Sequence, residues 1–341
     1  MYFVSLCILW YLSSSLTNNF NKQLMTAFPF PVSVVLIKFG TLLLIMLVIN
    51  KRKNILQRLH RNLIICLLPT ATLQIIGHVT SNAALEYATV SFVHTIKATT
   101  PLFTVIICRL MGEQFTLYLY LSLIPSMGGV MLVCASEIEF KMIGLVFAIT
   151  STVVFVLQNI FYKHLFDSKR HPRKILLTSY VPFSHDLITI IIDNLHTLHD
   201  IIDHTAITLD KLNVMFYSCF VSFTFLFPYW IITMEYVEAI QSDIYLSKFL
   251  FLAFMTGLMH TIQSLVAFTI IDQVSPVAYS IASLFKRVVV IFGSFIWFHQ
   301  QFYPIQGFGF ILTFIGLYFY QVAKTKAESV IETTIPHQHV S

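Results

Sequence analysis

We single out three basic residues inside long apolar runs of this 341-residue chain. Lys286 and Arg287 are adjacent near the middle of the run 277–298, and Lys97 lies in the run 90–111. A lysine or arginine at the centre of a membrane helix costs roughly 2.5–3.5 kcal/mol on insertion scales, so such residues usually serve a function. Their types favour phosphate, because an arginine fork fits phosphate oxygens in pairs and a lysine adds a mobile point charge.

These cations have no acidic partner inside the apolar runs, none of which contains Asp or Glu. We therefore expect them to face a water-filled cavity that receives an anion. Adjacent helical residues point about 100° apart, so Lys286 and Arg287 can hold two sides of one anion, and Lys97 could complete a three-cation cage. Such a cage suits a phosphate dianion better than a neutral sugar. The alternative is structural, with hydrogen bonds to backbone carbonyls or snorkelling to the interface.

Polar residues accompany Lys97 in its own run and in the preceding one. They are His78, Ser81, Asn82, His94 and Thr95. His94 lies three positions before Lys97, so the two share a helix face. Each of these residues alone is more often a satisfied packing residue than a ligand. Together they are consistent with one wall of a cavity.

The composition is that of a membrane protein. Hydrophobic residues make up 57% of the chain and charged residues only 11%, against roughly a quarter in soluble proteins. The five cysteines all fall in apolar runs and include no Cys-x-x-Cys pair, so we interpret them as small buried residues. We predict an all-α polytopic membrane protein that is not an enzyme and that needs no cofactor and no metal.

Ten segments have the length and apolarity of membrane-spanning helices, which need about 20 residues. They are residues 3–22, 30–49, 62–84, 90–111, 116–134, 142–162, 212–233, 249–271, 277–298 and 303–322. Pro101 and Pro125 are expected to bend their helices, and Gly128 and Gly129 to allow close packing. A further apolar stretch, 175–195, carries a proline, a histidine and two aspartates.

Charge sets the orientation, because basic loops stay in the cytosol. With ten spans and both termini cytosolic, the basic side holds Lys51, Arg52, Lys53, Arg58, Arg61, Lys163, Lys169, Arg170, Arg173, Lys174, Lys324 and Lys326. The opposite side holds Glu86, Glu137, Glu139, Glu235, Glu238 and Asp243. A span at 175–195 would move Lys324 and Lys326 to the acidic side, so we interpret 164–210 as a cytosolic insertion.

The insertion contains two weaker chemical patterns. His196, His199, Asp200, Asp203 and His204 follow helical spacing, which could serve zinc but is more typical of a polar surface face. The pair His185 and Asp186 could suggest an acyl-transfer enzyme, but nothing else in the sequence supports that activity.

The second half of the chain echoes the first. "EQFTLYLYLSLIPSMGG" from Glu113 and "QQFYPIQGFGFILTFIG" from Gln300 share the fourteen-residue spacing of a phenylalanine and a glycine. In this register Lys97 pairs with Leu284, so the cations correspond to within about one helical turn. Five spans in each half would cross in opposite senses, which predicts two inverted five-helix repeats with a substrate site between them. The predicted parts are 1–163 (the first repeat plus the sixth helix), 164–210 (the insertion), 211–323 (helices seven to ten) and 324–341 (a cytosolic tail).

Several pieces together resemble the triose-phosphate translocator family of the drug/metabolite transporter superfamily. They are "NNFNKQLMTAFPFPVSV", "VSFVHTIKATTPLF", "LSLIPSMGGVML", "VLQNIFYK" and "VSPVAYSIASLFKRVVVI". The resemblance covers nearly the whole chain except the insertion. It looks closest to the orphan E-type solute carrier 35 branch and its fungal secretory-pathway relatives, to which "DKLNVMFY" at 210–217 is also similar.

The resemblance implies a ten-helix carrier that exchanges phosphorylated compounds by alternating access. It implies that Lys97, Lys286 and Arg287 hold the phosphate, assisted by His78 and by Ser81, where the family has a threonine. A substrate-contacting tyrosine of the family matches Gln263 here. That difference leaves the phosphate inference in place and alters the part of the site that would read the rest of the substrate.

We therefore expect an antiporter that exchanges a sugar phosphate, triose phosphate or nucleotide sugar for phosphate or a related anion. The alternative is a non-transporting protein of ER–Golgi trafficking whose insertion binds partners. The resemblance implies the lipid bilayer of the Golgi or endoplasmic reticulum as its surroundings. A plastid envelope is not expected, since no Ser-rich, Arg-rich transit peptide precedes the first span. No nucleic-acid partner is expected, and the sequence leaves a dimer open.

Overall fold

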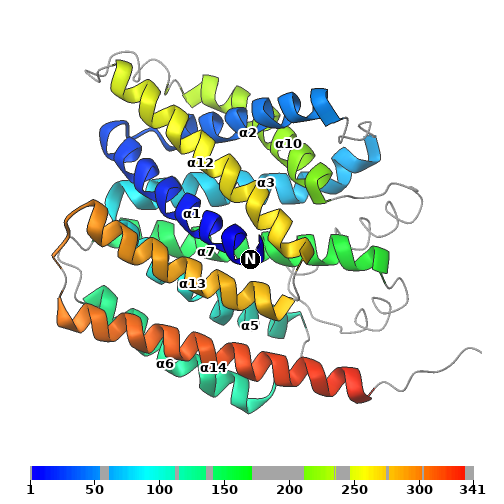
Figure 1. Ribbon diagram of the computed structural model, residues 1–341, viewed down its shortest axis with the longest axis vertical. Helices are drawn as coiled ribbons and strands as arrows, with labels where there is room; N and C mark the ends of the chain where they lie inside the picture. The colour runs from blue at the N-terminus through cyan, green and yellow to red at the C-terminus, as the bar shows by residue number, and fades with distance from the viewer. Residues whose placement is uncertain are drawn as a thin grey trace, which may run out of the picture.

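All regular structure in the described part of the chain is helical (Figure 1). The computed structural model describes residues 2–53, 61–111, 115–135, 141–170, 211–233, 235, 246–273, 276–301 and 303–334. The helices are α1 (Tyr2–Ala27), α2 (Pro31–Lys53), α3 (Arg61–Tyr87), α4 (Val90–Ala98), α5 (Thr100–Leu110), α6 (Leu117–Ala135), α7 (Met142–Arg170), α10 (Lys211–Thr233), α12 (Leu246–Gln273), α13 (Pro276–Trp297) and α14 (Pro304–Thr334). Each of the ten segments predicted from the sequence is helical, and the fourth is divided into α4 and α5.

The class of integral membrane protein is confirmed. Within the described residues, seven helical stretches are long and apolar enough to cross a membrane. Many large apolar side chains are exposed, as expected where a helix faces lipid. Helix α7 continues to Arg170, beyond the predicted end of the sixth span at 162. The zinc-like histidine pattern, the His185–Asp186 pair and most of the predicted insertion lie outside the described residues.

Helices α4 and α5 meet at Thr99. Pro101 lies in the first turn of α5 and lacks the N–H that a continuous helix would need at this point. The Thr99 hydroxyl donates to the Ile96 carbonyl at 2.6 Å, and its N–H also bonds the end of α4. The expected bend at Pro101 is therefore a break. It leaves Lys97 in the last turn of α4, where backbone carbonyls are open to partners from other helices.

Helices α6 and α14 lie side by side along one edge of the bundle (Figure 1). Their contact depends on small residues. A Cβ added at Gly129 would clash with the Gly309 carbonyl oxygen and with Thr313, so only glycine fits there. A Cβ at Gly128 would make an ordinary contact, 3.6 Å from Leu312. The expectation of close packing is thus met at Gly129, in the way small residues commonly pack membrane helices.

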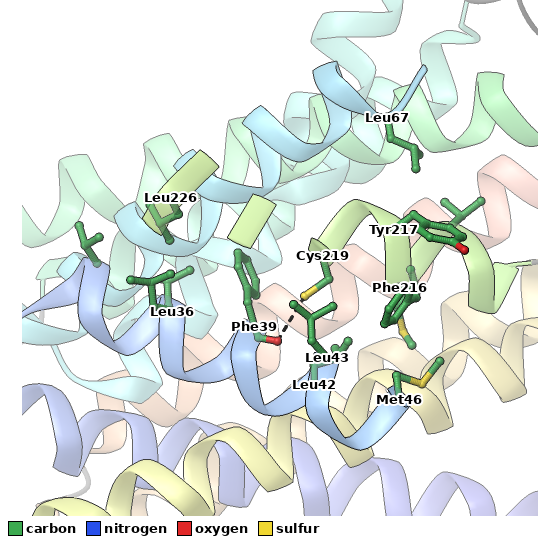
Figure 2. Close-up of a cluster of buried hydrophobic side chains, with 14 residues drawn as sticks. Leu36, Phe39, Leu42, Leu43, Met46, Leu67, Phe216, Tyr217, Cys219 and Leu226 are labelled. Carbon is green, nitrogen blue, oxygen red and sulfur yellow. Dashed lines mark hydrogen bonds between the residues drawn. The ribbon is translucent and has the colours of Figure 1, made fainter. Parts of the chain in front are cut away.

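A buried apolar cluster joins α2, α10 and the start of α3 at the other edge (Figure 2). Phe39 of α2 is fully buried in it, and the Cys219 thiol of α10 lies 3.7 Å from the Phe39 carbonyl oxygen. The Phe39 ring also meets the His78 ring edge to face, with centroids 5.3 Å apart. The core therefore supports a side chain that the sequence analysis placed in the site.

Candidate functional site

A cavity of about 220 Å³ lies between the helices, with walls from α1, α2, α3, α4, α7, α12 and α13. All seven residues predicted from the sequence line it: His78, Ser81, His94, Lys97, Gln263, Lys286 and Arg287. The described lining residues include no aspartate and no glutamate. Residues from both halves of the chain thus meet around one cavity, and the formal charge of its described lining side chains is positive.

Lys97 and Lys286 reach the cavity from α4 and α13. The Lys97 ammonium donates to the Ser81 hydroxyl at 2.6 Å and lies 5.6 Å from the centroid of the Phe155 ring. The Lys286 ammonium lies 4.5 Å from the centroid of the Trp10 ring. Both cations therefore rest against aromatic faces, which attract a cation by their quadrupole without neutralising it. Their charge remains available to an anion.

Arg287 combines a structural contact with its place in the cavity. Its Nη1 donates to the Lys97 carbonyl oxygen, and its Nη2 lies 3.4 Å from the Thr100 hydroxyl. The guanidinium therefore ties α13 to the break between α4 and α5. This is the carbonyl hydrogen bonding that the sequence left as an alternative for the cations. A guanidinium has five N–H donors, so this contact does not exhaust its capacity to bind an anion.

Histidines form the wall between α3 and α12. The His78 ring meets His260 at 5.5 Å and Phe155 at 5.3 Å between centroids, both nearly perpendicular. Among the described side chains, His94 Nε2 and Gln263 Oε1 are buried polar atoms for which no hydrogen-bond partner is found. Ser14 Oγ and Asn21 Oδ1, also on the cavity wall, are buried without a partner in the described residues as well. Buried polar atoms are nearly always paired in native proteins, so these four unpaired atoms on a cavity wall are suited to a ligand.

A third lysine, Lys38 of α2, also reaches the cavity. Its ammonium donates to Asn82 Oδ1 at 2.8 Å, and the same oxygen accepts from Asn21 Nδ2 at 3.1 Å. The Asn82 amide nitrogen in turn lies 3.4 Å from the Pro31 carbonyl oxygen. One buried asparagine therefore holds α1, α2 and α3 together beside the cavity.

The chain matches the Triose-phosphate Transporter family over residues 1–191 and 195–321. The chain belongs to this family. The match covers both halves, and it confirms the resemblance stated from the sequence motifs.

Relatives of this Triose-phosphate Transporter family member come from fungi and plants. The chain is 35% identical to the protein C83.11 of Schizosaccharomyces pombe, over 94% of this chain and 66% of that protein. It is 27% identical to a chloroplastic xylulose 5-phosphate/phosphate translocator of Arabidopsis thaliana, over 94% of this chain and 70% of that protein. A chloroplastic phosphoenolpyruvate/phosphate translocator of Oryza sativa is 29% identical, over 93% and 70%.

Several residues of the cavity wall of this family member were not predicted from the sequence. Lys38 meets the criterion that selected Lys97, a cation inside an apolar run, so the sequence could have identified it as a fourth intramembrane cation. His260 could have been found from its place three positions before Gln263, on the same helix face. Phe155 carries no such signal, because an apolar ring in an apolar run looks the same whether it faces lipid or a cavity.

Lys22 has a structural position in this family member. Its ammonium donates to the carbonyl oxygens of Leu85 at 2.6 Å and Ala88 at 3.0 Å, at the end of α3. A cation at this end stabilises a helix because the last carbonyls carry partial negative charge. From the sequence, Lys22 in "NKQL" is expected to snorkel to the membrane interface and to lie outside the site; the structure instead has it cap α3. Within the described residues, no group of three or more His, Cys, Asp or Glu side chains is placed to hold a metal ion.

Proposed function

We propose that the protein is a secondary transporter that exchanges a phosphorylated metabolite for phosphate or a related anion. The observation that carries the proposal is the cavity wall, on which Lys97, Lys286 and Arg287 meet without a carboxylate among the described lining residues. Three cations in a space of low dielectric repel one another, and a phosphate dianion relieves that repulsion. The translocator names of the plant relatives agree with this chemistry.

The size of the cavity favours a small metabolite. Pockets for drug-sized ligands measure roughly 300–1,000 Å³, and this cavity is smaller, at about 220 Å³. A sugar phosphate or a three-carbon phosphate fits such a volume better than a nucleotide sugar does. Of the substrates considered from the sequence, we therefore favour the smaller phosphorylated compounds.

Exchange follows from the same charges. Closing an empty cavity would desolvate the cations together, which is costly, whereas a bound anion screens them. The loaded carrier can therefore switch between opening to one side of the membrane and opening to the other, whereas the empty carrier makes this switch slowly. A trafficking role without transport gives no reason for such a cavity, so it is not favoured.

The helix pairings support two inverted repeats with alternating access between them. If α1, α2, α3, α4 and α6 correspond to α7, α10, α12, α13 and α14, most of the main contacts map onto one another. The contact of α1 with α12 maps onto α7 with α3, that of α2 with α12 onto α10 with α3, and that of α1 with α13 onto α7 with α4. The contacts of α2 with α10, α4 with α13 and α6 with α14 map onto themselves.

A Golgi or endoplasmic reticulum location and cytosolic termini belong to the same proposal.

Purified protein in liposomes tests the exchange. We expect labelled phosphate to enter vesicles loaded with phosphate and not vesicles that lack an internal anion. We also expect Lys286→Ala and Arg287→Ala to abolish uptake. Equal uptake into loaded and empty vesicles would refute exchange, and full activity of both variants would refute the site.

A further inference from the structure

Lys38 is a fourth cation of the cavity wall, and the proposed phosphate site of Lys97, Lys286 and Arg287 does not use it. Its side chain is 4% exposed, and its ammonium has three N–H donors, one of which bonds Asn82 Oδ1. That oxygen belongs to a neutral amide, so it satisfies a donor without balancing the charge. A buried ammonium needs an opposite charge to offset its desolvation. The cavity is where such a charge can come from.

Contacts with α1 place Lys38 and Lys286 toward different ends of the cavity. Lys286 lies over Trp10, whereas Lys38 reaches Asn82, which is bonded to Asn21. From Trp10 to Asn21 a helix rises about 16 Å, at about 1.5 Å per residue. The stretch of α1 between these two contacts also faces the cavity, through Ser14, Thr17 and Asn18.

Lys97 is anchored on α3 next to the anchor of Lys38. It is held by Ser81, and Lys38 is held by the next residue of α3, Asn82. Both anchors and both lysines line the cavity, so the two ammonium groups reach one space from different helices. A phosphate bound by Lys97 and Lys286 therefore has Lys38 on its Asn82 side, facing whatever the phosphate is attached to.

We propose that Lys38, positioned by Asn82, binds a second anionic group at the end of the metabolite opposite its phosphate. The inference rests on the proposed function and names its substrate class: small phosphorylated metabolites that carry a second negative charge, such as a carboxylate. A phosphate monoester carries about −1.5 to −2 charges at pH 7, which leaves about two of the four lining cations unmatched. A second anionic group reduces that excess, whereas a neutral hydroxyl end does not.

Competition between two matched compounds tests the inference. Vesicles with the full-length protein are loaded with phosphate, and the entry of labelled phosphate is measured against 3-phosphoglycerate or glycerol 3-phosphate. The two competitors share three carbons and a terminal phosphate, and they differ in a carboxylate against a hydroxymethyl group. We expect 3-phosphoglycerate to inhibit at about tenfold lower concentration, since an ionised partner strengthens a hydrogen bond substantially.

In the Lys38→Met variant, with inhibition scaled to that variant's own rate of phosphate exchange, the two inhibition curves should come together, and the exposed Lys141→Met should leave the tenfold difference unchanged. Loss of phosphate exchange by a monodisperse Lys38 variant would place Lys38 in the phosphate site itself and overturn the inference. If Lys38→Met does not yield monodisperse protein, Lys38→Gln replaces it, because its amide can still donate to Asn82. Exchange without discrimination by the wild type, or discrimination that survives in the Lys38 variant, overturns the inference alone. No phosphate exchange by the wild type overturns the proposed function and the inference with it.

Discussion

The contact between α6 and α14 and the wall of the cavity use their residues in opposite ways. At the first, glycines bring two backbones so close that a methyl group at Gly129 would clash. At the second, cations, histidines and amides stand around a space, and some of their polar atoms have no partner in the described part of the chain. The first region gains stability from close packing, and the second gives up stability to keep groups available. Substitutions should therefore separate stability from transport.

Removing a cation of the proposed phosphate site should have the largest effect, and only on transport. We expect Lys97→Met to lower phosphate exchange roughly 100-fold or more, because losing a buried charge partner costs about 2–5 kcal/mol of binding energy. The variant should be at least as thermally stable as the wild type, because it removes one of several repelling charges. Exchange rates and melting temperatures measured beside Lys141→Met check both points. A Lys97→Met protein that melts lower and transports normally would reverse the contrast.

The glycine contact should show the opposite behaviour. We expect Gly129→Ala to destabilise the protein by about 1–3 kcal/mol, as overpacking does, while the folded fraction keeps its competitor preference. The neighbouring Gly128→Ala is the matched control. It should be neutral or slightly stabilising, since a Cβ there has room and alanine favours a helix by about 1 kcal/mol over glycine. Denaturation of both variants in the same detergent compares them. Equal stability of the two would mean that α6 and α14 do not need this close approach.

Asn82 lies on the cavity wall, but it combines the two roles: it joins helices to one another, and it holds a cation of the cavity. Asn82→Leu removes the acceptor of Lys38 and Asn21, so we expect a loss of about 1–3 kcal/mol in stability. Affinity for 3-phosphoglycerate should fall as well, because Lys38 loses its anchor. Melting temperature and competition measured on the same preparation test this overlap. If only the melting temperature or only the competition changed, Asn82 would have only a structural role or only a binding role.

Ser81→Thr should have the smallest effect. It introduces the threonine that the family resemblance implies at this position, and its hydroxyl still accepts from the Lys97 ammonium. We expect phosphate exchange to change by no more than about threefold, within the 0.5 kcal/mol or so of a mild substitution. Ser81→Ala, which lacks the acceptor, should reduce exchange further. Equal activity of the alanine and threonine variants would show that this hydrogen bond does not position Lys97.

The sequence predicted the helices well because apolar length is a strong signal. It also predicted seven residues that line one cavity, since charged and polar residues inside apolar runs are rare. It placed a continuous fourth helix where α4 and α5 break at Thr99, because a proline predicts a disturbance but not its extent. The bonds from Asn82 to Asn21 and Lys38 could not be predicted. They depend on how α1, α2 and α3 pack, which no local pattern encodes.

Binding of phosphate to purified protein tests the central claim most directly. A ligand that binds only the folded state stabilises it by about 2.7 kcal/mol at one hundred times its dissociation constant. We predict that phosphate raises the melting temperature of the wild type and of Lys141→Met at constant ionic strength, and that chloride does not. Lys286→Met should lose this rise; it is preferred to an Arg287 variant, because Arg287 also ties α13 to α4. The same rise in Lys286→Met, or none in the wild type, would contradict the account.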